Sequence, residues 1–300
     1  AECWGDRVLI DSEKMPGAKF FPDARLNFAE NLLRKRDDSP ALIFQAEDQV
    51  KRQMSWAELY DAVSVLAQAL TDFGVRPGDR CAGFVPNMPE TVVAMLATTS
   101  LGAVWTSCSP DFGVNGVLDR FGQTKPKILF TADGYHYNGR AHDSLGRVAE
   151  FTAGLPTLEK IIVLPMLNGT PDTSGLANAI TLAEATTSYI PGEISFTQMP
   201  FNDPLYIMYS SGTTGKPKCI VHGIGGALIP HMKEHIIHCD AKPGDRVFYF
   251  TTCGWMMWNW LITALAAEAT LILYDGAPTY PDANVLFDLA EVTGMTLFGT

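Results

Sequence analysis

Residues 76–109, RPGDRCAGFVPNMPETVVAMLATTSLGAVWTSCS, decide the expected fold. The apolar run at 80–85 predicts a strand, 89–101 predicts a helix, and 103–109 predicts a second strand. Two strands joined through a helix form a βαβ unit, in which the strands run parallel and the helix covers one face of the sheet. This stretch therefore predicts an α/β protein.

A second stretch repeats the first. KPGDRVFYFTTC at 242–253 matches RPGDRCAGFVPN at 76–87, and each is followed by a helix and a strand. Pro243 lies 166 positions after Pro77, and Ala269 lies the same distance after Ala103. The motif PGDR alone is a common turn before a strand. Because the spacing survives a whole helix without a gap, we favour two units of the same topology.

The rest of the chain extends this α/β pattern. Ser55 and Glu58 form an expected capping box before a helix that Gly74 ends, and strands are expected at 127–132 and 160–165. We predict two similar, mostly parallel βαβ subdomains with helices on the sheet faces. The expected parts are an N-terminal segment (1–54), a first α/β subdomain (55–165), a connection (166–200) and an incomplete second subdomain (201–300).

Composition and charge argue against some classes of binding partner. The chain has 300 residues, 47% of them hydrophobic, and a net charge of −11, which repels nucleic acids and anionic membranes. The apolar run at 256–267 is shorter than the roughly 20 residues of a membrane span and contains Asn259. The N-terminus lacks a signal-peptide pattern, and the six cysteines form no CxxC pair. We expect a cytoplasmic protein with reduced thiols, no nucleic-acid or membrane partner, and an oligomeric state that the sequence does not specify.

Residues 209–222, YSSGTTGKPKCIVH, indicate a phosphate site. They follow an apolar strand, so the loop is expected at the carboxyl end of a sheet, where ligands bind. Glycines allow close backbone approach, hydroxyl groups donate hydrogen bonds and lysines supply positive charge. The contributing residues are Ser210, Ser211, Gly212, Thr213, Thr214, Gly215, Lys216 and Lys218. A Walker loop is excluded because only two residues separate the glycines and Pro217 follows Lys216.

The loop resembles the signature of adenylate-forming enzymes, which include acyl-CoA synthetases, luciferases and peptide-synthetase adenylation domains. The stretches at 54–63 and 96–113 are similar to other core segments of that family. FFPDARLNFAENLL at 20–33 is similar to the branch that activates short acids. Residues 219–235 and 250–260 resemble the ligases of that branch that act on acetoacetate. The resemblance implies that the chain is part of the large N-terminal domain of such an enzyme.

The resemblance also implies a reaction. Such ligases join a carboxylate to the α-phosphate of ATP, release pyrophosphate, and transfer the acyl group to the thiol of coenzyme A. Mg²⁺ bridges the anions. By motif position, 210–218 would contact the β- and γ-phosphates, with Lys216 as the main charge partner. The adenylation lysine is expected beyond Thr300, so residues 1–300 alone are expected to be inactive.

Other positions carry over from the family pattern. Gly254, Trp255, Met256 and Met257 match its acyl pocket, and His222 would form a pocket wall or a neighbouring support. For Trp258 and Trp260 a core position is favoured. Candidates for binding coenzyme A are Phe112, Gly113, Gly139 and Arg140. For Arg140, a solvated surface charge is an equal alternative.

Several alternatives stay open. Acetate, propionate or another short acid competes with acetoacetate, and a nucleotide-binding module without catalysis or, more weakly, a P-loop ATPase competes with the ligase. His231 and His235 share a helix face, and a structural role is favoured over metal binding because the zinc-protease pattern is absent. Glu268 stands where the first unit has Gly102. There it must either avoid the left-handed conformation or tolerate its strain.

Overall fold

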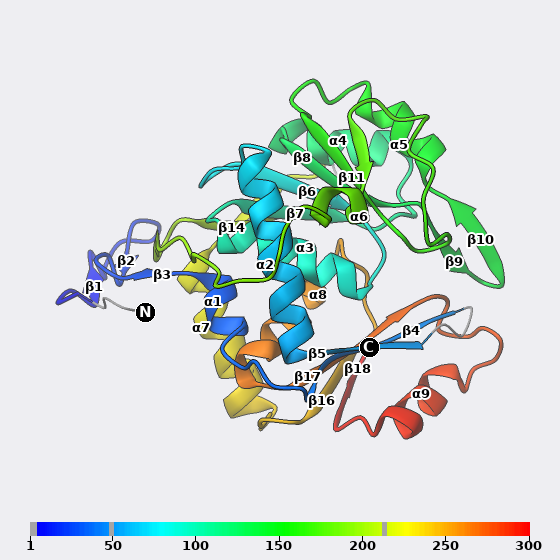
Figure 1. The fold of residues 1–300 in the computed structure, drawn as a ribbon. Coiled ribbons are helices and arrows are strands. Elements are labelled where there is room, and N and C mark those ends of the chain that lie inside the picture. The colour runs from blue at the N-terminus through cyan, green and yellow to red at the C-terminus, as the bar shows by residue number, and fades with distance from the viewer. Residues whose placement is uncertain (1–4, 48–50, 212–214) are drawn as a thin grey trace.

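The computed structural model describes residues 5–47, 51–211 and 215–300. Gly212, Thr213 and Thr214 of the predicted phosphate loop therefore lie outside the described residues. Two large sheets are separated by a central layer of helices (Figure 1). The predicted α/β class is confirmed.

The first large sheet has seven strands. Its strands are parallel except for the last pair, and their spatial order is β12 (Ala179–Thr181), β11 (Lys160–Leu164), β8 (Ile128–Ala132), β6 (Arg80–Phe84), β7 (Val104–Cys108), β14 (Pro204–Tyr209) and β15 (Cys219–Gly223). The antiparallel pair β14–β15 flanks the predicted phosphate loop. That loop therefore sits at one edge of the sheet.

The second large sheet has five strands, again parallel except for the last pair. Their order is β18 (Leu297–Gly299), β16 (Arg246–Tyr249), β17 (Thr270–Asp275), β4 (Pro40–Ala46) and β5 (Lys51–Ser55). Three small antiparallel pairs complete the strands: β1 (Leu9–Ile10) with β2 (Lys19–Phe20), β3 (Arg25–Leu26) with β13 (Met199–Pro200), and β9 (Gly134–Tyr137) with β10 (Arg140–Asp143).

The predicted repeat is confirmed. Strand β6, helix α3 (Pro89–Ser100) and β7 form the first repeated unit; β16, helix α8 (Met256–Thr263) with its 3₁₀ turn η2 (Ala264–Ala267), and β17 form the second. The neighbour order β8-β6-β7 matches β18-β16-β17. Even the turn hydrogen bonds correspond, since Gly78 N–H donates to the Gly102 carbonyl at 2.9 Å and Gly244 N–H donates to the Glu268 carbonyl at 3.0 Å.

The sheets do not follow the predicted boundaries. Hairpin β14–β15 belongs to the first sheet although it lies within 201–300, and β4 belongs to the second sheet although it lies within 1–54. Tyr206 of β14 pairs with Trp105 of β7, and Leu42 of β4 pairs with Leu271 of β17. Strand pairing depends on a partner distant in the chain, so local patterns do not reveal it.

Alternation along the strands creates three cores. The inner faces of both sheets share one core with α1 (Phe28–Leu32), α2 (Trp56–Asp72), α3, α7 (Ile224–Lys233) and α8. The outer face of the first sheet packs against α4 (Val114–Thr124) and α5 (Leu145–Thr152), and that of the second against α9 (Val285–Thr293). The remaining helical elements are α6 (Leu182–Thr186) and the π-helical turn η1 (Glu234–His238).

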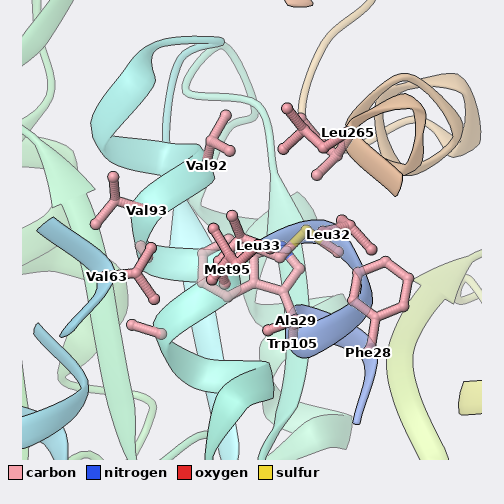
Figure 2. Close-up of a cluster of buried hydrophobic side chains, with 14 of the residues drawn as sticks. Phe28, Ala29, Leu32, Leu33, Val63, Val92, Val93, Met95, Trp105 and Leu265 are labelled. Carbon is pink, nitrogen blue, oxygen red and sulfur yellow. The ribbon is translucent and has the colours of Figure 1, made fainter. Parts of the chain in front are cut away.

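Figure 2 shows the centre of the shared core. Short helix α1 inserts its apolar residues among side chains from both repeated units. The cluster includes Phe28, Ala29, Leu32, Leu33, Val63, Val92, Val93, Met95, Trp105 and Leu265. Because this core is continuous, the two sheets are held as one packed body.

Two local expectations can be checked at helix ends. Ser55 and Glu58 form the expected capping box at the start of α2, and Gly74 after its end has φ of 78°. Glu268 adopts the left-handed conformation with φ of 58°. The second unit thus tolerates the strain that Gly102, with φ of 70°, avoids in the first.

Candidate functional site

The base of the predicted phosphate loop is closed by Ser210. Its N–H donates to the Lys218 carbonyl at 3.0 Å, and its Oγ accepts from the Lys218 N–H at 2.9 Å. These bonds extend the β14–β15 ladder by one step, so both ends of the loop leave the sheet together. Ser210 Oγ is an acceptor in this bond, and its own proton stays available to donate to a phosphate oxygen.

The second half of the loop rests on helix α4. Gln123 Nε2 donates to the carbonyl of Pro217 at 2.8 Å, and Pro217 is buried. Lys216 Nζ lies 3.1 Å from Asp119 Oδ1, while the Lys216 side chain is 77% exposed. An ion pair this exposed is weak, so Lys216 can exchange Asp119 for a phosphate at small cost. Lys218 is also exposed.

Strand β7 joins the phosphate loop to the predicted acyl pocket. Thr106 Oγ1 lies 2.8 Å from the Ile207 carbonyl and 2.7 Å from the Tyr209 hydroxyl, which anchors β14 just before the loop. The next residue, Ser107, donates from Oγ to the Cys253 carbonyl at 2.6 Å. Because successive side chains of a strand point to opposite faces, neighbouring residues of β7 hold the two parts of the site.

Gly254 lies against the carboxyl end of β7. A Cβ there would be 3.3 Å from the Ser109 nitrogen and 3.5 Å from the Cys108 Cα, both backbone atoms that cannot move aside easily. The glycine thus permits a close approach between the turn after β16 and the end of β7. The structure brings the predicted acyl-pocket turn and the predicted phosphate loop to the same strand.

The remaining acyl-pocket candidates differ in how exposed their side chains are to solvent. Trp255 is 62% exposed and Met256 is 41% exposed, whereas Met257 is half-buried. Trp258 and Trp260 are buried, which confirms the prediction that they belong to the core. Trp258 Nε1 donates to Asn87 Oδ1 at 2.9 Å.

His222 lies on β15, where it pairs with Tyr206 of β14. It is half-buried on β15, and its ring centroid is 5.0 Å from that of Tyr206. Burial lowers the pKa of the His222 imidazole, which favours the neutral ring. The histidine therefore supports Tyr206, and a direct wall position stays a prediction.

The predicted coenzyme A residues lie in two loops, and Arg147 holds the first of them. Its Nη1 donates to the Pro110 carbonyl at 2.6 Å, in the loop that carries Phe112 and exposed Gly113. Arg147 belongs to α5, which follows the β9–β10 hairpin whose turn carries Gly139 and Arg140. Arg140 is exposed and, among the residues the structure describes, has no side-chain hydrogen bond or ion pair. Its charge is free to meet an anion.

Residues 28–300 match the AMP-binding enzyme family. The chain belongs to that family.

The chain can also be compared with individual members of the family. It is 52% identical to an acetoacetyl-coenzyme A synthetase of Rhizobium meliloti (strain 1021), over 99% of this chain and 45% of that protein. The solved structure of an acetoacetyl-CoA synthetase from Streptomyces lividans superposes with a TM-score of 0.93 at 48% identity, covering 98% of this chain and 45% of that one. A malonamoyl-CoA synthetase of Penicillium aethiopicum is 39% identical over 98% of this chain and 44% of that protein.

This AMP-binding enzyme chain thus spans less than half the length of those relatives. In the described ranges, no helix combines the length and apolar character needed to cross a membrane. The same ranges contain no cluster of three or more His, Cys, Asp or Glu residues suited to a metal ion.

Sequence reasoning missed a buried carboxylate that positions some of the predicted coenzyme A residues of this chain. Glu47, at the end of β4, accepts hydrogen bonds from the backbone N–H groups of Asn138 at 2.9 Å, Gly139 at 2.6 Å and Ala277 at 2.6 Å. Gly139 has φ of 76°, and a Cβ there would be 2.8 Å from the Tyr280 ring. Glu47 thereby fixes the hairpin turn beside the end of β17. No local pattern around Glu47 signals this role.

Arg120 is a second residue that the sequence did not single out. Its guanidinium carbon lies 4.4 Å from the Phe112 ring centroid and 5.7 Å from that of Tyr209. It donates from Nη1 to the Gly116 carbonyl at 2.8 Å. Arg120 therefore carries positive charge between the coenzyme A candidate loop and the strand that leads into the phosphate loop.

Asp275 ends β17 where the two repeated units meet. Its Oδ1 accepts from the Asn87 N–H at 3.1 Å. Burial raises the pKa of the Asp275 carboxyl to about 7, and the Asn87 bond opposes that rise. The carboxyl therefore titrates near neutral pH.

The two helix-face histidines have structural partners. His231 Nδ1 lies 3.0 Å from Thr263 Oγ1, and His235 Nε2 lies 2.8 Å from the Trp260 carbonyl. Both rings are buried, and burial lowers the pKa of His231 to about 4. These contacts tie α7 and η1 to α8, as expected for a structural role.

Proposed function

We propose that the protein containing this chain is an acid–thiol ligase that activates acetoacetate with ATP and transfers it to coenzyme A. In the first step the carboxylate attacks the α-phosphate, giving acetoacetyl-AMP and pyrophosphate. In the second step the thiol of coenzyme A displaces AMP and gives acetoacetyl-CoA. We further propose that it acts in the cytoplasm on small molecules, without nucleic-acid or membrane partners.

One observation carries this proposal. Neighbouring residues of β7 hold the strand before the phosphate loop and the turn of the acyl pocket, through Thr106 and Ser107. The reaction must bring two anions, a carboxylate and a triphosphate, to one place. Holding both sites on a single rigid strand favours the encounter, and the lysines of the loop offset the charge repulsion.

The substrates have candidate partners along this edge. The loop residues 210–218 would bind the β- and γ-phosphates of ATP, which arrives with Mg²⁺. Gly254, Trp255, Met256 and Met257 would surround the acid. Phe112, Gly113, Gly139 and Arg140 would bind coenzyme A, with exposed Arg140 as a charge partner.

A second acid is favoured by one relative. The malonamoyl-CoA synthetase of Penicillium aethiopicum is 39% identical over nearly the whole chain. Malonamate and acetoacetate share a carbonyl group on carbon 3 and differ in the group beyond it. Malonamate is therefore the second candidate substrate, ahead of acetate or propionate, which lack that oxygen.

Exchange of labelled pyrophosphate into ATP by the full-length protein tests the proposal. We expect exchange to be fastest with acetoacetate, when it is compared with malonamate, acetate, propionate and butyrate at matched concentrations. Fastest exchange with malonamate would keep the reaction and change the substrate. Absence of exchange with every acid would leave a nucleotide-binding protein without this chemistry.

The phosphate loop can be tested with one charge change. We expect Lys216→Ala to lower kcat/KM for ATP by about 10-fold to 100-fold, because a charge-assisted contact with the phosphates is lost. The matched control is Lys242→Ala, which removes an exposed lysine paired with Asp240 on another loop. Equal kinetics in both variants would remove Lys216 from the phosphate site.

A further inference from the structure

A narrow, partly open space lies beside Gly254, one of the predicted acyl-pocket residues. It lies where β7, β14, α8 and the turn after β16 converge, and it is too narrow to admit a water molecule. Its lining residues are Trp105, Ser107, Tyr206, Ile207, Met208, Cys253, Gly254 and Asn259. Cys253 and Gly254 also belong to the turn that leads into Trp255 and Met256, so this space borders the acyl-pocket residues directly.

Tyr206 contributes an unpaired hydroxyl to this region. Its side chain is 1% exposed, and its hydroxyl oxygen is buried without a hydrogen-bond partner among the described residues. One side of the ring packs against His222. In the register of the sheet, Tyr206 is paired with Trp105, which packs against Trp258 of α8. The tyrosine is thus on the face of the sheet that α8 covers.

Asn259, on α8, contributes a buried amide whose oxygen is unpaired among the described residues. It is 2% exposed, and its Oδ1 is buried without a hydrogen-bond partner within the described ranges. Its Nδ2 donates to the thioether of Met208, with the nitrogen 3.6 Å from Sδ. A thioether is a weak acceptor, so the amide is left largely unsatisfied.

Two unpaired buried polar groups lining one space need a physical reason. Buried polar groups in native proteins nearly always have a partner, because leaving one unpaired is costly. The free space is too narrow for a water molecule as it stands, so water does not supply the missing bonds. Met208 is the flexible lining side chain, and its rotation would open the space toward the pocket.

Helix geometry places these groups below the pocket mouth. Asn259 follows Trp255 by four residues and Met256 by three, so it lies one turn deeper on a neighbouring part of the α8 face. Trp255 and Met256 are largely exposed, whereas Asn259 is buried. An acid entering between them would meet apolar side chains first and polar groups at its far end.

We propose that Tyr206 and Asn259 form the polar floor of the acid pocket and select acids that carry a carbonyl oxygen on carbon 3. This inference rests on the proposed ligase function and deepens it. The Tyr206 hydroxyl and the Asn259 Nδ2 donate hydrogen bonds to that oxygen once Met208 has rotated, while Asn259 Oδ1, an acceptor, takes no part. An acid of the same length without the oxygen leaves both groups unpaired, which is the strongest basis for discrimination that a pocket has.

The test compares acetoacetate with butyrate, which has the same carbon chain and no 3-oxygen. Pyrophosphate exchange by the full-length protein gives kcat/KM for each acid. We expect the wild type to favour acetoacetate by about 100-fold or more, and Tyr206→Phe and Asn259→Leu each to lower that ratio by about 10-fold or more. The KM for ATP should stay unchanged, which a general packing defect would not allow.

Tyr60→Phe is the matched control. It removes the hydroxyl of another buried tyrosine, which lies 3.2 Å from Glu193 and does not line this space. Its acid ratio should equal that of the wild type. Tyr206→Phe deletes only an unpaired hydroxyl, so it should melt at or above the wild-type temperature.

The outcomes separate two failures. If all proteins catalyse exchange and the ratio of kcat/KM for acetoacetate to that for butyrate is unchanged in Tyr206→Phe and Asn259→Leu, the proposed polar floor is overturned. The proposed ligase function would still stand. A wild-type ratio near one would do the same. No exchange with any acid in the wild type would overturn both proposals.

Discussion

The two repeated units have the same order of strands and helix, but the loop that leads into the helix is more exposed in the second unit than in the first. In the first unit, the loop from Val85 to Met88 between β6 and α3 is buried throughout. In the second unit, the corresponding connection ends at Trp255, which is 62% exposed. One unit therefore builds the core with this loop, while the other presents a side chain to solvent. Shared topology fixes where a loop lies and leaves its chemistry free.

The units also contact each other reciprocally. The Asn87 N–H, in the first unit, donates to Asp275 at the end of the second unit's last strand, with a distance of 3.1 Å. Ser107, near the end of the first unit's last strand, donates to the Cys253 carbonyl in the second unit at 2.6 Å. Cys253 stands 166 positions after Asn87, as the repeat requires. The candidate site lies at this junction.

The largest effect is expected from a substitution that disrupts the packing of the second unit. Trp258→Ala should lower the free energy of unfolding by about 3–5 kcal/mol, because it leaves a large cavity and an unpaired Asn87 amide oxygen. Val92 holds the equivalent position in the first unit, and Val92→Ala should cost only about 1–2 kcal/mol. Urea unfolding followed by circular dichroism measures both.

Trp255→Ala is the control for that comparison. The side chain is mostly exposed, so its removal should change the unfolding free energy by less than about 0.5 kcal/mol. If Trp255→Ala lowered the unfolding free energy as much as Trp258→Ala does, the division of the second unit into a buried part and an exposed part would be wrong.

A glycine exchange between the units sharpens the comparison. Gly102→Ala should cost about 2–3 kcal/mol in unfolding free energy, since it adds left-handed strain and places a Cβ against Met199. The Cβ would be 2.7 Å from Met199 Sδ. Glu268→Gly should instead stabilise by about 0.5–1 kcal/mol, because it relieves the strain of a non-glycine at positive φ. Destabilisation by Glu268→Gly, measured by urea unfolding, would contradict this account.

The last expected effect depends on pH and concerns charge at the junction. The folded-state pKa of Asp275 is about 7, above its ordinary value of 3.8. A raised carboxyl pKa gives stability that is complete below about pH 4 and is lost as the pH rises through about 7. Asp275→Asn keeps an oxygen for the Asn87 N–H and removes the charge. It should stabilise by about 1–2 kcal/mol at about pH 8 and by much less at about pH 4.

Ser109, which holds the equivalent position in the first unit, supplies the control. It carries no titratable charge, so the effect of Ser109→Ala on unfolding should not change with pH. Unfolding curves at the two pH values decide the matter, and a gain from Asp275→Asn that is equal at both would contradict the assigned titration.

Local sequence patterns predicted much of the scaffold. The helices at α2 and α3, the strands β6, β7, β8 and β11, and the repeat all follow from hydrophobic period, capping residues and glycine stops. The phosphate loop was predicted from its glycines, hydroxyl groups and lysines, which need no tertiary partner to be noticed. The core position of Trp258 and Trp260 was also predicted, because α8 needs a buried face.

The pairing of distant segments escaped prediction. Sequence patterns did not place β14 beside β7 or β4 beside β17. The neighbour of a strand and its position in the sheet depend on packing across the whole domain. They also gave no reason to connect Glu47 with Gly139, or Tyr206 with Asn259. These side chains lie in ordinary strand and helix patterns, and only their burial near one another makes them notable.

The sequence by itself determined the α/β class and the repeated unit, and it was enough to predict a phosphate loop, since these depend on residues close together in the chain. Only the tertiary structure decided that the loop and the acyl turn meet on β7, that Asp275 is held at the junction, and that two unpaired polar groups line the space below the pocket. The physical reason is that hydrogen-bond partners and desolvation arise from contacts between segments, and a linear pattern carries no record of them.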